Sequence, residues 1–183
     1  MTTRLRLDRG FTLTEMMLTV AVLATIAAMG VPVLRDLTAD IKVNEAARMV
    51  ERELQDARLR AVSVNRILRV RLNCPQAGQF RTVEYVNAST VDTATNRCDP
   101  TTYPYPAADD DVLTRPNYDG PVRIMPTPAT VGSEIIEFHP DGTAKNVVSN
   151  VASTMTSPVT ITVTRYGRYR MVTVNGAGKV QLQ

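Results

Sequence analysis

Residues 10–34 read GFTLTEMMLTVAVLATIAAMGVPVL, and this stretch decides the fold of the chain. From Phe11 to Leu34 it is an apolar run of 24 residues that contains a single charged side chain, Glu15. As an α-helix the run is roughly 36 Å long, which exceeds the roughly 30 Å thickness of the hydrocarbon core of a bilayer. The sequence therefore predicts a helix that spans a membrane over residues 11–34.

The charges on either side of the run predict its orientation. Arg4, Arg6 and Arg9 precede it, and a long stretch of mixed composition follows it. Because positively charged flanks stay on the cytoplasmic side of a membrane, we expect residues 1–10 inside and the domain after the span outside.

Glu15 breaks the pattern of the run. On insertion scales a carboxylate at the centre of a membrane-spanning helix costs about 2.5–3.5 kcal/mol. A buried charge is tolerated when an opposite charge pairs with it. The sequence therefore predicts a cationic partner for Glu15.

The segment Gly10-Phe11-Thr12-Leu13-Thr14-Glu15, placed after a basic leader, resembles the processing signal of type IV prepilins and type II secretion pseudopilins. The resemblance implies that a prepilin peptidase cuts between Gly10 and Phe11 and that Phe11 is N-methylated. It also implies that Glu15 meets the N-terminal amine of a neighbouring subunit during assembly. The expected partners are other pilins or pseudopilins, and the expected location is the bacterial inner membrane. The head would then lie in the periplasm, and the subunit would end in a pilus or pseudopilus.

Two other interpretations of this segment stay open. The first is an ordinary secretory signal cleaved near Ala24, Ala27 or Ala28, and the second is a signal anchor in which Glu15 has no role. The run is longer than the 7–15 apolar residues of a secretory signal, and helical periodicity continues beyond it. Both facts favour the prepilin interpretation.

Residues 35–64 extend the helix as an amphipathic half. Apolar residues recur at helical spacing, with arginine and glutamate on the other face. The apolar positions are Leu37, Ile41, Ala47, Val50, Leu54, Ala57 and Ala61.

After Asn65 the apolar period changes from 3.6 to 2, which is typical of strands with one buried face. The predicted strands are 68–72, 80–86, 122–125, 135–138, 143–148, 159–164, 168–174 and 180–182. The expected fold class is α+β: a long N-terminal helix with a transmembrane first half, packed on an antiparallel β-sheet head over 65–183. Residues 87–120 are rich in Asp, Thr, Pro and Tyr, and they predict an irregular insertion that is too polar for the core.

The two cysteines, Cys74 and Cys98, cannot supply four zinc ligands and do not form a CxxC motif. In an exported domain we expect them to form a disulfide, which would stabilise the fold by about 3.5 kcal/mol in the chain-entropy model. Two unrelated buried thiols are the alternative.

No motif of a known enzyme stands out, so we expect no catalytic residues, no cofactor and no metal. His139 is the only histidine and precedes Pro140, which favours a structural role in a turn over that of a catalytic base. The run 109–111 is three aspartates, but it lacks the spaced ligands and glycine of a known calcium loop, so a solvated acidic turn is the simpler interpretation. Asn175-Gly176-Ala177-Gly178 predicts a hairpin turn.

The C-terminal region is basic, with no acidic residue after Asp141. Four of its cations are candidates for contact with DNA phosphates: Arg165, Arg168, Arg170 and Lys179. Residues 136–142 and the segment Gly167-Arg168-Tyr169-Arg170 resemble the GspH/FimT branch of minor pilins and pseudopilins. Some members of that branch bind double-stranded DNA through a Gly-Arg-x-Arg element, which implies a DNA contact here. A solvated, cationic strand edge is the alternative.

These features predict a minor type IV pilin that takes part in pilus assembly and has a possible role in DNA uptake. A minor pseudopilin of a type II secretion system is the alternative with the same N-terminal signal. An exported enzyme with an ordinary signal is a third interpretation.

Overall fold

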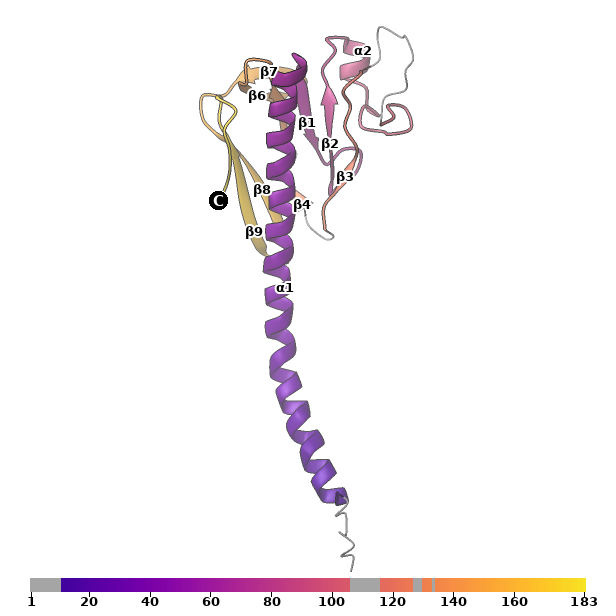
Figure 1. Cartoon of the computed structure of the whole chain (residues 1–183), viewed down its shortest axis with the longest axis vertical. Coiled ribbons are helices and arrows are strands. Elements are labelled where there is room, and N and C mark those ends of the chain that lie inside the picture. The colour runs from indigo at the N-terminus through magenta and orange to yellow at the C-terminus, as the bar shows by residue number, and fades with distance from the viewer. Residues whose placement is uncertain (1–10, 106–115, 127–129, 133) are drawn as a thin grey trace, which may run out of the picture. The chain divides into compact units, whose positions relative to one another are not determined.

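The computed structural model describes residues 11–105, 116–126, 130–132 and 134–183 (Figure 1). The chain divides into two compact units, Met1–Thr38 and Ala39–Gln183, which we describe separately. Helix α1 (Leu13–Val64) contributes to both. The other elements are β1 (Leu68–Leu72), β2 (Gln79–Glu84), α2 (Ser89–Asp92), β3 (Arg123–Ile124), β4 (Thr130–Val131), β5 (Ile135–Phe138), β6 (Ala144–Val148), β7 (Val151–Thr154), β8 (Val159–Arg165), β9 (Arg168–Val174) and β10 (Val180–Leu182).

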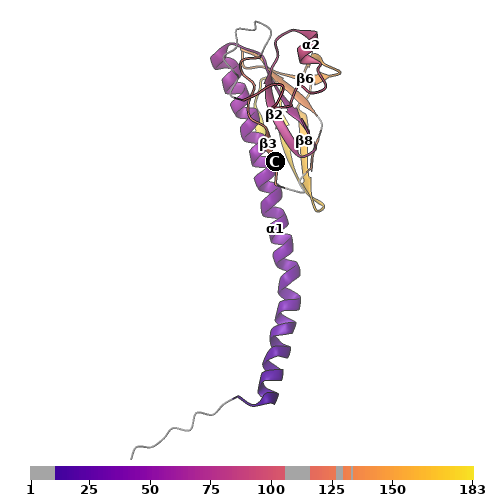
Figure 2. The same cartoon turned by 90° about the vertical axis from the view of Figure 1, so that its right-hand side faces the viewer.

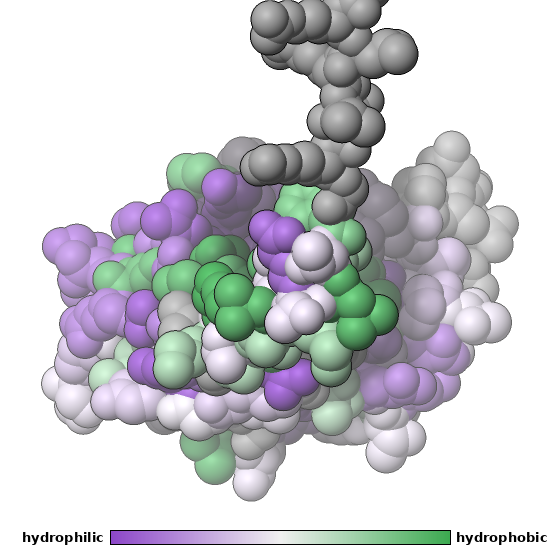
Figure 3. Space-filling model, turned by 90° about the horizontal axis from the view of Figure 1, so that it is seen from below, coloured by the Kyte–Doolittle hydropathy of each residue, from purple (hydrophilic) through white to green (hydrophobic). Residues whose placement is uncertain are grey.

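The described part of the first unit is the N-terminal half of α1. Thr12 begins the helix, since its Oγ1 accepts a hydrogen bond from the Glu15 amide at 3.3 Å and its carbonyl accepts one from the Met16 amide at 3.1 Å. The helix is long and apolar enough to cross a membrane by length and composition, and none of its apolar window is buried. Figure 3 shows apolar side chains gathered in green at the N-terminal end of the described chain.

In the second unit, α1 from residue 39 onward packs on antiparallel strands. Its buried positions are valine, leucine and above all alanine, and the small side chains let the sheets approach the helix backbone closely. These positions are Val43, Ala46, Ala47, Val50, Leu54, Ala57 and Ala61. The expected α+β class, a long helix packed on an antiparallel head, is confirmed.

Two predicted apolar positions of the helix are exposed. Leu37 is 55% exposed and Ile41 is 65% exposed, whereas Val43 is fully buried. Side chains two positions apart point about 200° away from each other around a helix. The Ile41 side chain therefore faces away from the surface that Val43 contacts.

The strands form two sheets where a single sheet was expected (Figure 2). The six-stranded sheet has the order β3-β2-β1-β5-β6-β7, and the four-stranded sheet has the order β10-β9-β8-β4. All eight predicted strands are present, some with ends shifted by one or two residues. The missed strands, β4 and β7, are short and mostly exposed, so neither carries an alternating apolar pattern.

Arg58 connects α1 to a turn of each sheet. Its Nε donates to the Gly142 carbonyl at 3.0 Å, in the turn between β5 and β6. Its Nη2 donates to the Ala177 carbonyl at 3.1 Å, in the turn between β9 and β10. The two turns come so close that a Cβ on Gly178 would lie 2.2 Å from the Gly142 oxygen, so only glycine fits there.

Candidate functional site

The first candidate site is the start of α1. Phe11 is 72% exposed, and Glu15 lies in the first turn of the helix on an exposed, apolar surface. Within the described part of the chain, the Glu15 carboxylate has no hydrogen-bond or ion-pair partner. Gly10 lies outside the described residues. Among residues 11–105, 116–126, 130–132 and 134–183, no cation neutralises the lone carboxylate.

This position suits an intermolecular pair. A carboxylate in the first turn is favoured by the free N–H groups and positive dipole end of the helix. Those groups do not replace a full positive charge when the surroundings are hydrocarbon or packed apolar side chains. The arrangement therefore leaves an acceptor for an external ammonium group.

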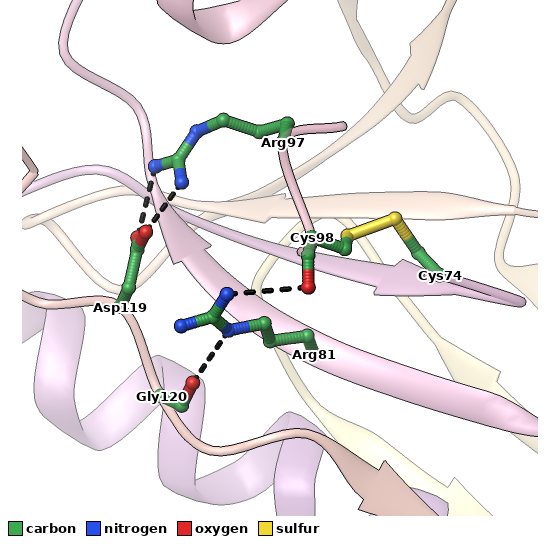
Figure 4. Close-up of a disulfide and its surroundings, with 6 residues drawn as sticks. All are labelled: Cys74, Arg81, Arg97, Cys98, Asp119 and Gly120. Atoms are coloured by element: carbon green, nitrogen blue, oxygen red, sulfur yellow. Dashed lines mark hydrogen bonds and ion pairs between the residues drawn. A yellow bond between two sulfur atoms is a disulfide. The ribbon is translucent and has the colours of Figure 1, made fainter. Parts of the chain in front are cut away.

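The second site is the disulfide that closes the insertion. Cys74, after β1, and Cys98 are joined with a Cα–Cα distance of 5.6 Å and a sequence separation of 24 residues (Figure 4). The expected pairing is present in the structure. The bridge ties the insertion to the end of β1.

The interpretation of residues 87–120 as too polar for the core is wrong. Cys98 is buried, and so are three charged residues of the segment, Asp92, Arg97 and Asp119. Arg97 forms a two-pronged ion pair with Asp119, with Nη2 at 2.8 Å from Oδ1 and Nη1 paired with Oδ2 (Figure 4). The segment was also predicted to be irregular, but it contains a short helix, α2. The Asp119 carboxylate compensates the charge of the buried Arg97 guanidinium, while Nε of Arg97 has no acceptor among the described residues.

Arg81 of β2 holds the same segment through its main chain. Its guanidinium is fully buried and donates to the carbonyls of Gly120 at 2.6 Å, Cys98 at 3.2 Å and Tyr103 at 2.5 Å. Burial lowers the pKa of Arg81, and the charge of Asp119 acts in the opposite direction. The side chain remains a cation at neutral pH. Sequence analysis missed this residue, because an alternating strand pattern does not reveal that a loop covers its polar face.

His139 belongs to a polar cluster of the six-stranded sheet. Its Nε2 lies 2.8 Å from Oε1 of Glu137, an ion pair when the imidazole is protonated. The other carboxylate oxygen of Glu137 accepts from Nε of Arg69 at 2.6 Å, and the Arg69 guanidinium lies over the Tyr85 ring. Glu137 therefore has two basic neighbours, and the geometry fits a structural role for His139.

The third site is the turn between β8 and β9. Tyr166 and Gly167 both have positive φ values, 47° and 75°, which makes a tight two-residue hairpin. Arg165 and Arg168 are opposite each other in the register, and Arg170 is opposite the buried Val163. The three arginines therefore share one face of the hairpin, the face that is turned toward the core.

Lys179 does not join these arginines. It lies in the turn between β9 and β10, next to the Ala177 carbonyl that Arg58 binds. Arg168, by contrast, pairs with Asp40 of α1, with 3.7 Å between Nε and Oδ1. Since Asp40 and Arg58 are 18 residues apart on α1, the two turns are separated by roughly 27 Å along the helix.

An open groove of about 410 Å³ lies along α1 in the second unit. Its lining is charged, with one apolar side chain: Glu45, Arg48, Met49, Arg52, Glu53, Asp56 and Arg123. The lining contains no serine, cysteine or histidine. Among the described residues no group of three or more His, Cys, Asp or Glu is placed to hold a metal ion. The aspartates at 109–111 lie outside those residues.

Comparison with known proteins bears on the first site. Residues 5–31 match the family model of the prokaryotic N-terminal methylation motif. The match is confined to the N-terminal segment and includes Gly10, Phe11 and Glu15. No curated protein matches the chain.

Two crystal structures of the type IV minor pilin FimU of Pseudomonas aeruginosa (strain PAO1) are similar to this structure. The one in space group P65 is 16% identical, has a TM-score of 0.44, and the match covers 76% of this chain and 91% of that chain. The one in space group P21 is 15% identical, has a TM-score of 0.46, and the match covers 80% of this chain and 92% of that chain. Neither similarity identifies a partner or ligand of this chain.

The buried ion pair of the insertion generates a prediction. Asp119→Asn leaves the Arg97 guanidinium buried without its counter-charge, and we expect it to lower the free energy of unfolding by about 3–5 kcal/mol. Urea unfolding of the detergent-solubilised chain, followed by circular dichroism, measures this. The matched control is Glu45→Gln, which breaks the exposed pair with Lys42 and should cost less than about 1 kcal/mol. Equal effects of the two changes would show that the Arg97–Asp119 pair does not hold the insertion.

Proposed function

We propose that this chain is a minor type IV pilin that takes part in pilus assembly without acting as an enzyme. The single observation that supports this is the position of Glu15. It is a carboxylate on an exposed apolar helix, without a partner among the residues that the structure describes, and it lies within the segment that matches the prokaryotic N-terminal methylation motif. The fold of a long apolar helix with a packed head is consistent with such a subunit.

The proposal gives the carboxylate its partner. Cleavage between Gly10 and Phe11 creates a new N-terminal amine, and N-methylation of Phe11 keeps that nitrogen cationic. An amine and a carboxylate that are both surrounded by apolar side chains stabilise each other far more than either is stabilised alone. A subunit would then enter the filament where its amine meets the Glu15 of its neighbour.

The proposed organisation follows from this processing. Residues 1–10 are a leader that the prepilin peptidase removes, and residues 11–34 are the transmembrane half that becomes the filament core. Residues 35–64 are the amphipathic half of the helix, and residues 65–183 are the head, with an insertion over about 87–120. The subunit waits in the inner membrane with its head in the periplasm.

A minor pseudopilin of a type II secretion system is the alternative, since the same motif and fold serve it equally well. Neighbouring genes separate the two proposals, because pilus-assembly genes favour the first and secretion genes favour the second.

A DNA contact at the β8–β9 turn is a further proposal within this function. Tyr166 and Tyr169 are 73% and 57% exposed, so both rings are available to stack on bases. The position of the arginines is less favourable, because Arg168 is engaged with Asp40 and Lys179 lies at a distance.

The DNA proposal has a direct test in the purified chain. If the arginines contact phosphates, Arg168→Gln with Arg170→Gln should weaken binding to double-stranded DNA and reduce the salt slope by about 2. A gel shift at several salt concentrations measures this. Lys145→Gln, which removes one charge from β6 in the other sheet, is the control. Unchanged binding at matched salt would remove the proposal.

The assembly proposal predicts the behaviour of Glu15→Ala. We expect leader removal to proceed and incorporation into pili to be lost, because the neighbour's amine then has no counter-charge. Immunoblots of sheared pili and of membranes measure the two steps in a strain that lacks the native protein.

Thr14→Ala, next to Glu15 and without charge, is the matched control and should assemble normally. If Glu15→Ala subunits enter pili at the level of the control, the proposed pairing is wrong.

A further inference from the structure

The cationic face of the β8–β9 turn consists of Arg165, Arg168 and Arg170. It lies against α1 at the position of Asp40. Arg168 and Asp40, two exposed side chains 3.7 Å apart, mark this position along the helix, and Arg165 and Arg170 lie on the same face of the hairpin as Arg168. Nε and Nη1 of Arg165 are buried and have no acceptor among the residues that the structure describes. With Asp40 as the one acidic partner of the three arginines in that part of the chain, the turn carries an excess of about two positive charges.

Aromatic side chains flank these charges. Tyr166, at the tip, is 73% exposed, and Tyr169 on the opposite face of β9 is 57% exposed. The Arg165 guanidinium lies 5.3 Å from the centre of the Tyr166 ring. Tyrosine is enriched at the interface between membrane and water, where its ring lies at the depth of the headgroups.

The chain itself keeps this turn close to the proposed membrane span. Asp40 follows Leu34, the last residue of the apolar run, by six residues. Six residues rise about 9 Å as a helix and cover at most about 21 Å when fully extended. A head that is held at Asp40 therefore cannot carry the turn far from the bilayer surface while the span is in place.

We infer that the β8–β9 turn docks on anionic phospholipid headgroups of the bilayer that holds residues 11–34. Arg168 and Arg170 bind the headgroup phosphates, Arg165 contributes its positive charge to the turn, and Tyr166 enters the interface. The docking rests on the proposed membrane-anchored state and belongs to the subunit before assembly. Entry into the filament removes the span from the lipid and breaks the contact.

Lipid is favoured over DNA by the direction of the arginines. A DNA duplex needs an open cationic surface, whereas these side chains share the core-facing side of the hairpin and one of them pairs with α1. A headgroup layer stays within reach of this turn, because only six residues separate Leu34 from Asp40.

The absence of tryptophan from the chain allows a clean test. Tyr166→Trp places the sole indole at the tip of the turn in the full-length chain, reconstituted in vesicles. Phosphatidylcholine vesicles are compared with vesicles that also contain phosphatidylglycerol, each with a lipid brominated near the headgroup. We expect strong quenching of the indole only in the anionic vesicles. Each of the three Arg→Gln changes should lower the docked-to-free ratio about fivefold, and high salt should lower it as well.

Two other tryptophan variants separate the possible failures. Leu23→Trp reports on the span and is measured with a lipid brominated near the end of its acyl chains, because residue 23 lies at the centre of the span. Val151→Trp reports on β7, a strand of the other sheet of the head. Quenching at 23 without quenching at 166 overturns the docking and leaves the anchored state intact. Absence of quenching at 23 overturns the anchored state and the docking with it.

The remaining outcomes are equally decisive. Equal quenching at 151 and 166 shows a non-specific contact of the head with lipid and overturns the inference. The salt response of the Tyr166→Trp chain decides the matter even if the arginine variants misfold. If the arginine variants lose DNA binding while quenching at 166 is unchanged, the turn is a DNA site and the lipid inference is wrong.

Discussion

One charge constrains the N-terminal half of this chain. Glu15 is the only charged side chain between Phe11 and Leu34, and the described chain provides no partner for it. A carboxylate in such surroundings is costly alone and acceptable beside a cation. The proposed filament supplies that cation from outside the subunit, as the amine that processing exposes. Assembly and the stability of the isolated subunit are thereby linked, because the subunit is incomplete until a neighbour arrives.

The head also contains charges away from water, and several of them are paired within the head itself. Its charges are buried together with their partners: Arg97 with Asp119, Arg69 with Glu137, and Arg81 with three carbonyl groups. The disulfide adds a covalent closure to the same insertion. On the other side of the strands, alanine positions of α1 let the sheets approach the helix closely. These three arginines of the head thus have internal partners, in contrast to Glu15 at the start of the helix.

Much of this architecture could be predicted from the sequence, because the deciding patterns are local. The span, the amphipathic half and the main strands all show in the spacing of apolar residues, and the two cysteines could be paired once export was assumed. The two-sheet arrangement could not be predicted, since it depends on which strands pair with which, and strands such as β1 and β5 pair across more than 60 residues of sequence. The burial of Arg97 and Asp119 was missed for a different reason. They are distant in sequence, and each is tolerable inside only because the other is there. The contact of the β8–β9 turn with α1 is also a contact between distant residues, Arg168 and Asp40, and no local pattern in the sequence reveals it.

The central claim is that Glu15 pairs with the N-terminal amine of Phe11 in a neighbouring subunit. That amine exists only after cleavage between Gly10 and Phe11. The most direct measurement is the intact mass of the mature protein purified from cells, with sequencing of its first residues. The account predicts a chain that begins with N-methylated Phe11. A mature chain that begins near Met29, or one that keeps Met1 through Gly10, would contradict it.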